Sequence, residues 1–125
     1  MDDTRIIYEY TIGLPLEYQK HPGLHNALKA LDEQLTRLTG GLRRTSGQGT
    51  WASGAQHNNF TGTIEYNHTI TYNLCIVPSE EERLKIQFEQ TFSQVLRENN
   101  LPINHIHAMR MIASECIFAL NDKKT

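Results

Sequence analysis

Glycine, arginine and tryptophan are concentrated in one short segment, residues 40–51, which reads GGLRRTSGQGTW. Glycine allows a ligand to approach the backbone closely, and exposed backbone N–H groups can bind an anion. Arginine can pair with that anion, and tryptophan can stack on a base or another planar group. The segment therefore predicts a binding site for a nucleotide or another small anionic molecule. The ligand-binding residues would be Arg43, Arg44, Gly47, Gly49, Trp51 and Glu65.

A structural role explains the same segment equally simply, as a helix end, a bulged edge strand and a packed tryptophan. Arg43 and Arg44 are neighbours in a segment expected to be a strand, so only one of them can face a given pocket. The segment is not a P-loop, because no Gly-Lys-Ser/Thr follows and it precedes a strand, not a helix. It is not a dinucleotide-binding fingerprint for the same reason.

Six histidines raise two further possibilities, metal binding and acid–base catalysis. His105 and His107 would lie on one face of a strand, but no nearby acidic pattern completes a metal site, so we expect no metal and no cofactor. A pKa near neutrality would let His68, His105 or His107 transfer protons, with Glu65 or Glu115 orienting the ring. Surface, core or interface roles explain the same histidines. The sequence leaves the question of an enzyme open and favours a binding protein.

The hydrophobic pattern predicts the elements that would position these residues. Period-2 alternation predicts a strand over residues 4–12, with Ile7 as the exception, and a leucine stripe predicts a helix from Pro22 to a stop at Gly40-Gly41. A second helix would begin with Ser79 as its cap and Glu82 as the capping-box partner, and would stop at Asn99-Asn100. A last strand is expected over residues 103–120, which a break near Ala113-Ser114-Glu115 would divide.

The clearest pattern in the chain is the alternation over residues 63–77. Every second residue from Ile64 to Ile76 is apolar except His68, and polar residues fill the gaps as far as Asn73. A strand of this length exceeds the usual ~5–6 residues, so it should project past the sheet or join another subunit. Together with residues 42–51 it would form a long antiparallel hairpin with its tip near Gly54–Phe60.

The order strand, helix, strand, strand, helix, strand predicts an α+β fold of the ferredoxin-like βαββαβ type. Such a plait has a four-stranded antiparallel sheet with both helices on one face. We expect a single domain over residues 1–120 and a short tail over 121–125.

Composition is that of a folded protein. The chain has 125 residues, 38% hydrophobic residues and a formal net charge of −2, which excludes a disordered or fibrous chain and makes nucleic acid an improbable partner. No apolar run reaches the ~20 residues of a membrane helix, and the acidic start, Met1-Asp2-Asp3, has no signal-peptide core, so we expect no membrane association. Cys75 and Cys116 lie in apolar segments and are interpreted as core residues of a reduced, cytoplasmic protein.

The predicted architecture resembles the small trimeric ferredoxin-like proteins of the PII signal-protein family and their CutA relatives. More locally, the chain is similar to small α/β proteins with a GG…GxGxW…E pattern, on residues Gly40, Gly41, Gly47, Gly49, Trp51 and Glu65. The PII resemblance implies nucleotide or small-anion binding in clefts between subunits, beside a long hairpin. The expected function is an oligomeric small-ligand-binding protein, either a regulator or a protein that sequesters a signal nucleotide.

Two helices can cover only one face of the predicted sheet. The apolar face of the long strand should extend beyond them and leave a patch larger than a soluble monomer usually exposes. We therefore expect a homo-oligomer, a trimer ahead of a dimer, with Tyr66 and Ile70 at the interface. A protein that only assembles or binds a partner, and has no pocket, is the third alternative after the ligand-binding protein and the enzyme.

Overall fold

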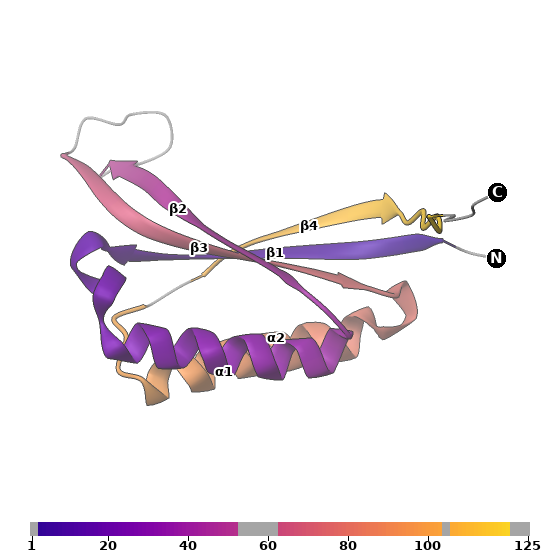
Figure 1. Cartoon of the computed structure of the whole chain (residues 1–125), viewed down its shortest axis with the longest axis horizontal. Helices are drawn as coiled ribbons and strands as arrows, with labels where there is room; N and C mark the ends of the chain where they lie inside the picture. The colour runs from indigo at the N-terminus through magenta and orange to yellow at the C-terminus, as the bar shows by residue number, and fades with distance from the viewer. Residues whose placement is uncertain (1–2, 53–62, 104–105, 121–125) are drawn as a thin grey trace.

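The computed structural model describes residues 3–52, 63–103 and 106–120, and at residues 51 and 52 it describes the backbone alone. Figure 1 shows a sheet with helices beneath it. The elements in chain order are β1 (Thr4–Pro15), the 3-10 turn η1 (Leu16–Lys20), α1 (Pro22–Thr39), β2 (Arg43–Ala52), β3 (Ile64–Ile76), the 3-10 turn η2 (Pro78–Glu80), α2 (Glu81–Glu98) and β4 (His107–Ser114).

The four strands form one antiparallel sheet in the order β2-β3-β1-β4. Helices α1 and α2 lie side by side on one face of this sheet, and no helix of the described residues lies on the other face, called the open face below (Figure 1). The predicted α+β class, with a four-stranded antiparallel sheet and two helices, is confirmed. The arrangement is consistent with a ferredoxin-like plait.

The core lies between the sheet and the helices, where strand alternation directs every second side chain. On β1 the buried side chains run from Ile6 to Leu14, and on β3 from Ile70 to Ile76. The helices contribute buried stripes consisting of Leu24, Ala27, Leu31 and Leu35 from α1 and Leu84, Phe88, Phe92, Val95 and Leu96 from α2. The helical stripes have the 3–4 residue spacing that one covered face requires.

Ile70 corrects part of the expectation about assembly. Its side chain is 0% exposed and belongs to the core of a single chain, so it is not available to a second subunit. Tyr66 and Ile64 lie on the same side of β3 but are 59% and 52% exposed. The alternation of apolar and polar residues along β3 shows which side chains share a face, but it does not show at which residue the helices stop covering that face.

Strand β3 does project past the rest of the sheet. Its pairing with β1 ends at Asn67, opposite Pro15, whereas its pairing with β2 continues to Ile64, opposite Ala52. Residues 64–66 therefore pair with β2 alone, and Figure 1 shows this part of the hairpin curving away from the helices. The expected hairpin tip, Gly54–Phe60, lies outside the described residues.

The helix ends agree with the sequence at three of four positions. α1 has Pro22 in its first turn and ends at Gly40, which has a left-handed φ of 86°, and Asn100 after α2 has a positive φ of 54°. The predicted cap of α2 is wrong. Ser79 lies inside η2, and α2 begins at Glu81 without a side-chain cap hydrogen bond, because the 3-10 turn from Pro78 leads directly into the helix.

Two further expectations need correction. The last strand is limited to His107–Ser114, so it begins later than expected, and the described residues before it, Leu101–Ile103 and Ile106, belong to no strand. Cys75 and Cys116 are both exposed rather than in the core. Cys75 alternates with the buried Leu74 and Ile76, which places it on the open face, and Cys116 follows the end of β4.

Among the described residues, no helix combines the length and the apolar character needed to cross a membrane.

Candidate functional site

A pocket of about 530 Å³ lies on the helix side of the sheet, between α2, the connecting residues 101–103 and 106, and the β4 edge. Pockets of a few hundred Å³ with an apolar lining and a few polar groups are typical small-molecule sites. The lining residues are Tyr10, Glu89, Phe92, Ser93, Leu96, Arg97, Leu101, Ile103, Ile106 and Ala108.

Helix α2 forms one wall because five of its residues share a face. Residues 89, 92, 93, 96 and 97 repeat at helical spacing, so their side chains line one side of the helix. Phe92 and Leu96 are buried and apolar, whereas Glu89, Ser93 and Arg97 are exposed and polar. The wall is therefore apolar at depth and polar at its rim, and we call Glu89, Ser93 and Arg97 the rim of the pocket.

The floor of the pocket depends on a small residue opposite a large one. Tyr10 of β1 pairs directly with Ala108 of β4, and residues that pair in this way point to the same face of the sheet. Ala108 has only a methyl group, so it leaves open the space beneath β4 that a longer side chain would fill. The connection with Leu101, Ile103 and Ile106 closes the pocket on the other side.

The hydroxyl group of Tyr10 is buried and has no hydrogen-bond partner among the described residues. The side chain is 3% exposed, and its ring packs against Phe92 at 4.9 Å between centroids. Buried hydroxyls nearly always have a partner, and an unsatisfied one costs about 1–3 kcal/mol. Because Tyr10 lines the pocket, a molecule in the pocket can supply that partner.

Two neighbouring tyrosines show how unusual this hydroxyl is. Tyr8, two residues earlier in β1, donates to the Glu81 carboxylate, and Tyr72 of β3 donates to Asp32 at 3.1 Å. Both point, like Tyr10, to the helix side of the sheet. The hydroxyls of Tyr8 and Tyr72 therefore each donate to a carboxylate of the same chain, whereas that of Tyr10 has no partner among the described residues and faces the pocket.

Tyr10 is a neutral hydrogen-bond donor at physiological pH. Burial raises the pKa of its phenol well above the ordinary value of 10, and the nearby Glu89 carboxylate raises it further. A neutral phenol can donate one hydrogen bond and accept another, so it can recognise a carbonyl, hydroxyl, carboxylate or ring nitrogen of a ligand.

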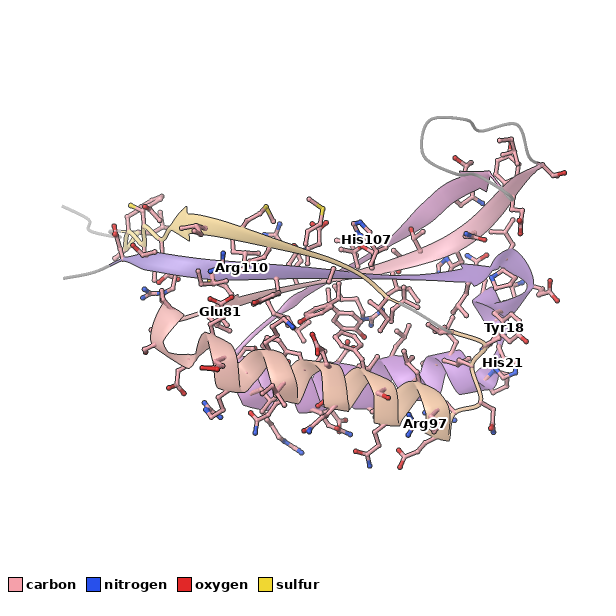
Figure 2. All side chains as sticks on the ribbon, turned by 180° about the vertical axis from the view of Figure 1, so that it is seen from behind. Tyr18, His21, Glu81, Arg97, His107 and Arg110 are labelled. Carbon is pink, nitrogen blue, oxygen red and sulfur yellow. The ribbon has the colours of Figure 1, made fainter. Side chains whose placement is uncertain are left out.

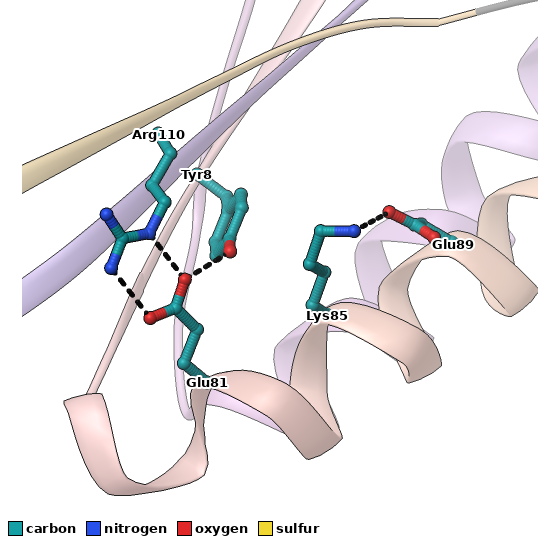
Figure 3. A network of polar contacts seen from close by, with 5 residues as sticks. All are labelled: Tyr8, Glu81, Lys85, Glu89 and Arg110. Atoms are coloured by element: carbon teal, nitrogen blue, oxygen red, sulfur yellow. Dashed lines mark hydrogen bonds and ion pairs between the residues drawn. The ribbon is translucent and has the colours of Figure 1, made fainter.

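Arg97 is the charged group at the rim that is free to bind an anion. It donates to Ser93 Oγ at 2.9 Å and forms no ion pair among the described residues. Figure 2 shows it near the C-terminal end of α2. The rim carboxylate, Glu89, is engaged with Lys85 at 2.8 Å (Figure 3). The rim therefore offers one uncommitted positive charge.

A polar network holds the first turn of α2 to β4. Arg110 donates to both oxygens of Glu81, with 2.9 Å between Nη2 and Oε1, and Tyr8 donates to the same carboxylate (Figure 3). The bonds from Arg110 and then Tyr8 lower the pKa of Glu81 from 4.5 to about 2. The carboxylate stays ionised at any ordinary pH, and the network joins the start of α2 to β1 and β4.

The two arginines predicted to bind a ligand point to opposite sides of the sheet. Arg44 pairs with Tyr72, so it lies on the helix side, where it makes a bidentate ion pair with Asp32 at 2.9 and 3.0 Å. That bond, ahead of the opposing effect of burial, raises the pKa of Arg44. Arg43, the next residue, is exposed on the open face and makes no ion pair among the described residues.

The other predicted ligand residues lie along the β2–β3 hairpin. Gly47 pairs with Thr69 and Gly49 with Asn67, and the backbone of Trp51 pairs with Glu65, which is exposed. A Cβ atom at Gly49 would come within 3.0 Å of the Thr69 side chain, so this glycine allows close packing between neighbouring strands. The pocket beneath β4 contains none of these residues.

The candidate catalytic residues are separated. His68 is buried on the helix side of β3, whereas His107, opposite Thr11, is exposed on the open face (Figure 2). Glu115 pairs with Arg5 at 3.1 Å. His105 lies outside the described residues. A shared acid–base site of His68 and His107 is not formed within one chain.

The structure gathers no metal-binding cluster of three or more His, Cys, Asp or Glu side chains within residues 3–52, 63–103 and 106–120. His21 instead accepts a hydrogen bond at Nδ1 from the Gly23 amide at 3.0 Å and caps α1, with Tyr18 packed beside its ring (Figure 2).

Analysis of the sequence missed the pocket. Alternation predicts Tyr10 only as part of a half-buried strand, and the expected last strand includes residue 103, so the sequence indicates no separate wall at this edge. One local signal was present in α2, where Ser93 and Arg97 follow the apolar residues at positions 92 and 96 along one helix face. The pairing of Tyr10 with Ala108 joins distant parts of the chain and had no local signal.

Comparison with known proteins finds no matching family model and no matching curated protein. Two solved structures have related arrangements. A phage SAM lyase in complex with S-methyl-5'-thioadenosine is 6% identical, with a TM-score of 0.47, over 87% of this chain and 91% of that chain. A structure from Burkholderia cenocepacia described as an amidohydrolase/peptidase is 16% identical, with a TM-score of 0.38, over 88% of this chain and 27% of that chain. Similarity at these values carries no statement about ligand or activity.

Proposed function

We propose that this protein binds a small anionic molecule with an apolar, planar body in the pocket between α2 and β4. The observation that carries the proposal is the buried Tyr10 hydroxyl, which lines the pocket and has no partner among the described residues. The proposal keeps the expected class of function, a small-ligand-binding protein, and moves its site from β2 to the opposite edge of the sheet.

Each part of the pocket would contact one part of such a ligand. The apolar body packs against Phe92 and Leu96, whose burial excludes water. The neutral Tyr10 phenol donates to an acceptor on the ligand, a bond of about 1 kcal/mol. Arg97 at the rim pairs with a carboxylate, sulfonate or phosphate. A nucleoside monophosphate has all three parts, which agrees with the expected nucleotide class.

We also infer that the fold is the ferredoxin-like βαββαβ plait with a long β2–β3 hairpin. The strand order β2-β3-β1-β4, the antiparallel pairing and the two helices on one face support this assignment. In this arrangement the edge strand β4 and α2 are adjacent, which puts the pocket at the edge of the molecule.

The binding experiment uses two probes: 8-anilinonaphthalene-1-sulfonate, an apolar anion that fluoresces in dry sites, and AMP as its competitor. We expect saturable fluorescence with one site per chain, and displacement of the dye by AMP. Arg97→Gln should weaken binding of the dye about tenfold, the loss expected for one charge-assisted hydrogen bond. Arg43→Gln is the matched control, because Arg43 is also an exposed arginine without an ion pair among the described residues.

Three results would contradict the proposal. They are the absence of saturable dye binding, equal binding by the wild type and Arg97→Gln, and a loss of binding in Arg43→Gln alone. The last result would return the site to the glycine-rich strand β2. Saturable dye binding that AMP does not displace would keep the pocket and exclude the nucleotide class.

A further inference from the structure

The two edges of the sheet differ in chemistry. The β2 edge carries charged and small residues, with Arg43, Arg44, Gly47 and Gly49 in its strand. Charges and glycines are common means of preventing a sheet edge from pairing with another chain. The β4 edge lacks this protection, because the strand His107–Ser114 has a single charged residue, Arg110, and that residue is engaged with Glu81.

Exposed apolar side chains gather at the β4 edge. Met109 and Met111 are 48% and 39% exposed on the open face, and Ile112 is 68% exposed on the helix side. Ile117, Phe118 and Leu120, just after the strand, are also exposed. Six of the eleven exposed large hydrophobic residues that the structure describes therefore follow residue 107, in a protein of 125 residues. Clusters of this kind mark interaction surfaces.

The outer edge of β4 also has unpaired backbone groups. β4 is the terminal strand of the sheet, and within the described part of the chain only β1 pairs with it. An unpaired strand edge recruits another strand through its N–H and C=O groups. A second copy of the same strand fits this edge well, because antiparallel pairing about a two-fold axis satisfies both edges at once.

We infer that two copies of this chain associate through their β4 strands, antiparallel, with Met111 on the two-fold axis. The two four-stranded sheets then form one continuous sheet with all four helices on the same side. This inference is independent of the ligand proposed above and requires no residue of the rim.

The register follows from the side chains that would face one another. With Met111 on the axis, Met109 lies opposite Ala113 of the second copy, so the three residues from each chain form one apolar patch on the open face. His107 lies opposite Glu115, whose carboxylate also pairs with Arg5 of its own chain, so no like charges meet at this end of the strand. Shifting the axis to Arg110 would place two like charges directly opposite, which destabilises a pair of strands. Shifting it to Ile112 would place Met109 opposite Glu115.

The test is the mass of the protein in solution, measured by sedimentation equilibrium and light scattering. The protein concentration should range from about 1 to about 100 μM, because weak dimers with an interface of ordinary size are populated in that range. We expect twice the 14.3 kDa of one chain. Met111→Glu places two negative charges against each other at the axis and should raise the dimer dissociation constant on the order of 100-fold. Ile86→Glu, at an exposed isoleucine of α2, is the matched control and should remain dimeric.

A thiol cross-linking experiment tests the register without relying on a destabilising change. In a Cys75→Ser, Cys116→Ser background, Met111→Cys should cross-link to itself, because the two Cβ atoms of directly opposite residues lie about 5 Å apart. Met109→Cys should cross-link far less. A mass of one chain or of three chains, a dimer unaffected by Met111→Glu, or equal cross-linking at positions 109 and 111 would overturn the inference.

Discussion

Tyr10 and Ala108 lie directly opposite each other in the antiparallel pairing of β1 with β4, and their difference in size opens the pocket. Tyr10 provides an aromatic floor and a buried hydroxyl, and the small side chain of Ala108 leaves room for the pocket on the helix side of β4. The ligand site that we propose therefore rests on a cross-strand pair, with α2 providing the apolar wall and the charge.

Ala108→Leu should close the pocket from the strand side. The added side chain points to the helix side of the sheet, into the space next to the Tyr10 ring, and we expect dye binding to fall at least about tenfold because the apolar volume is lost. Fluorescence titration of the variant measures this. Ser46→Leu, an exposed position on the same face of the sheet but on the far edge strand β2 and outside the lining, is the control and should bind as the wild type does. Unchanged binding by Ala108→Leu would contradict the location of the site.

Tyr10→Phe and Tyr72→Phe should change stability in opposite directions. Removing the Tyr10 hydroxyl takes away an unsatisfied buried group and should raise the free energy of unfolding by about 1 kcal/mol. Removing the Tyr72 hydroxyl breaks its bond to Asp32 and should lower it by about 1 kcal/mol. Urea unfolding monitored by circular dichroism measures both. A loss of stability in Tyr10→Phe as well would show that the Tyr10 hydroxyl has a partner in the free protein.

The strands and helices could be predicted from the sequence because their patterns are local. The alternation of β3 and the leucine stripe of α1 each report one face of one element, and the structure confirms both. The site could not be predicted, because it depends on which residues of distant strands become neighbours. Arg44 illustrates this well: nothing near it in the sequence indicates that Asp32, on the preceding helix, would engage it. The coverage of Ile70 by the helices depends likewise on where two separate elements overlap.

Arg44→Gln should lower stability and leave ligand binding unchanged. The ion pair with Asp32 is partly exposed, so we expect a loss of about 0.5–1 kcal/mol from the free energy of unfolding. Dye affinity should equal that of the wild type, because Arg44 lies at the far edge of the sheet from the pocket. A loss of affinity in this variant with no loss of stability would instead support a ligand site on β2.

The Glu81 network should make stability depend on acid pH. Its folded-state pKa of about 2 lies below the ordinary 4.5, so the folded protein holds the ionised form more strongly than the unfolded chain does. The stabilisation is fully present above pH 4.5 and is lost as the pH falls toward 2. Urea unfolding at pH 7 should show Glu81→Gln less stable than the wild type, with the difference shrinking between pH 4.5 and 2. A difference that does not change with pH would contradict this account, and Glu82→Gln is the neighbouring control.

Gly23→Ala should destabilise the junction of α1 with the end of α2. A Cβ atom at this position would lie 2.8 Å from the Asn99 carbonyl oxygen and 2.9 Å from the His21 ring that caps the helix. We expect a loss of about 1–3 kcal/mol, the range for overpacking at a tight contact. Gly41→Ala, which has nothing within 4 Å of its added methyl group, is the matched control and should be close to neutral in thermal unfolding.

Nuclear magnetic resonance titration of the uniformly ¹⁵N-labelled protein with 8-anilinonaphthalene-1-sulfonate tests the central claim most directly. The account predicts that the amide signals of Ser93, Arg97 and Ala108 shift together and saturate, while those of Arg43, Gly47 and Gly49 remain in place. In Tyr10→Phe the dissociation constant obtained from the same shifts should be about fivefold higher, the effect of one lost hydrogen bond. Shifts confined to the β2 residues, or no saturating shift around Ala108, would contradict it.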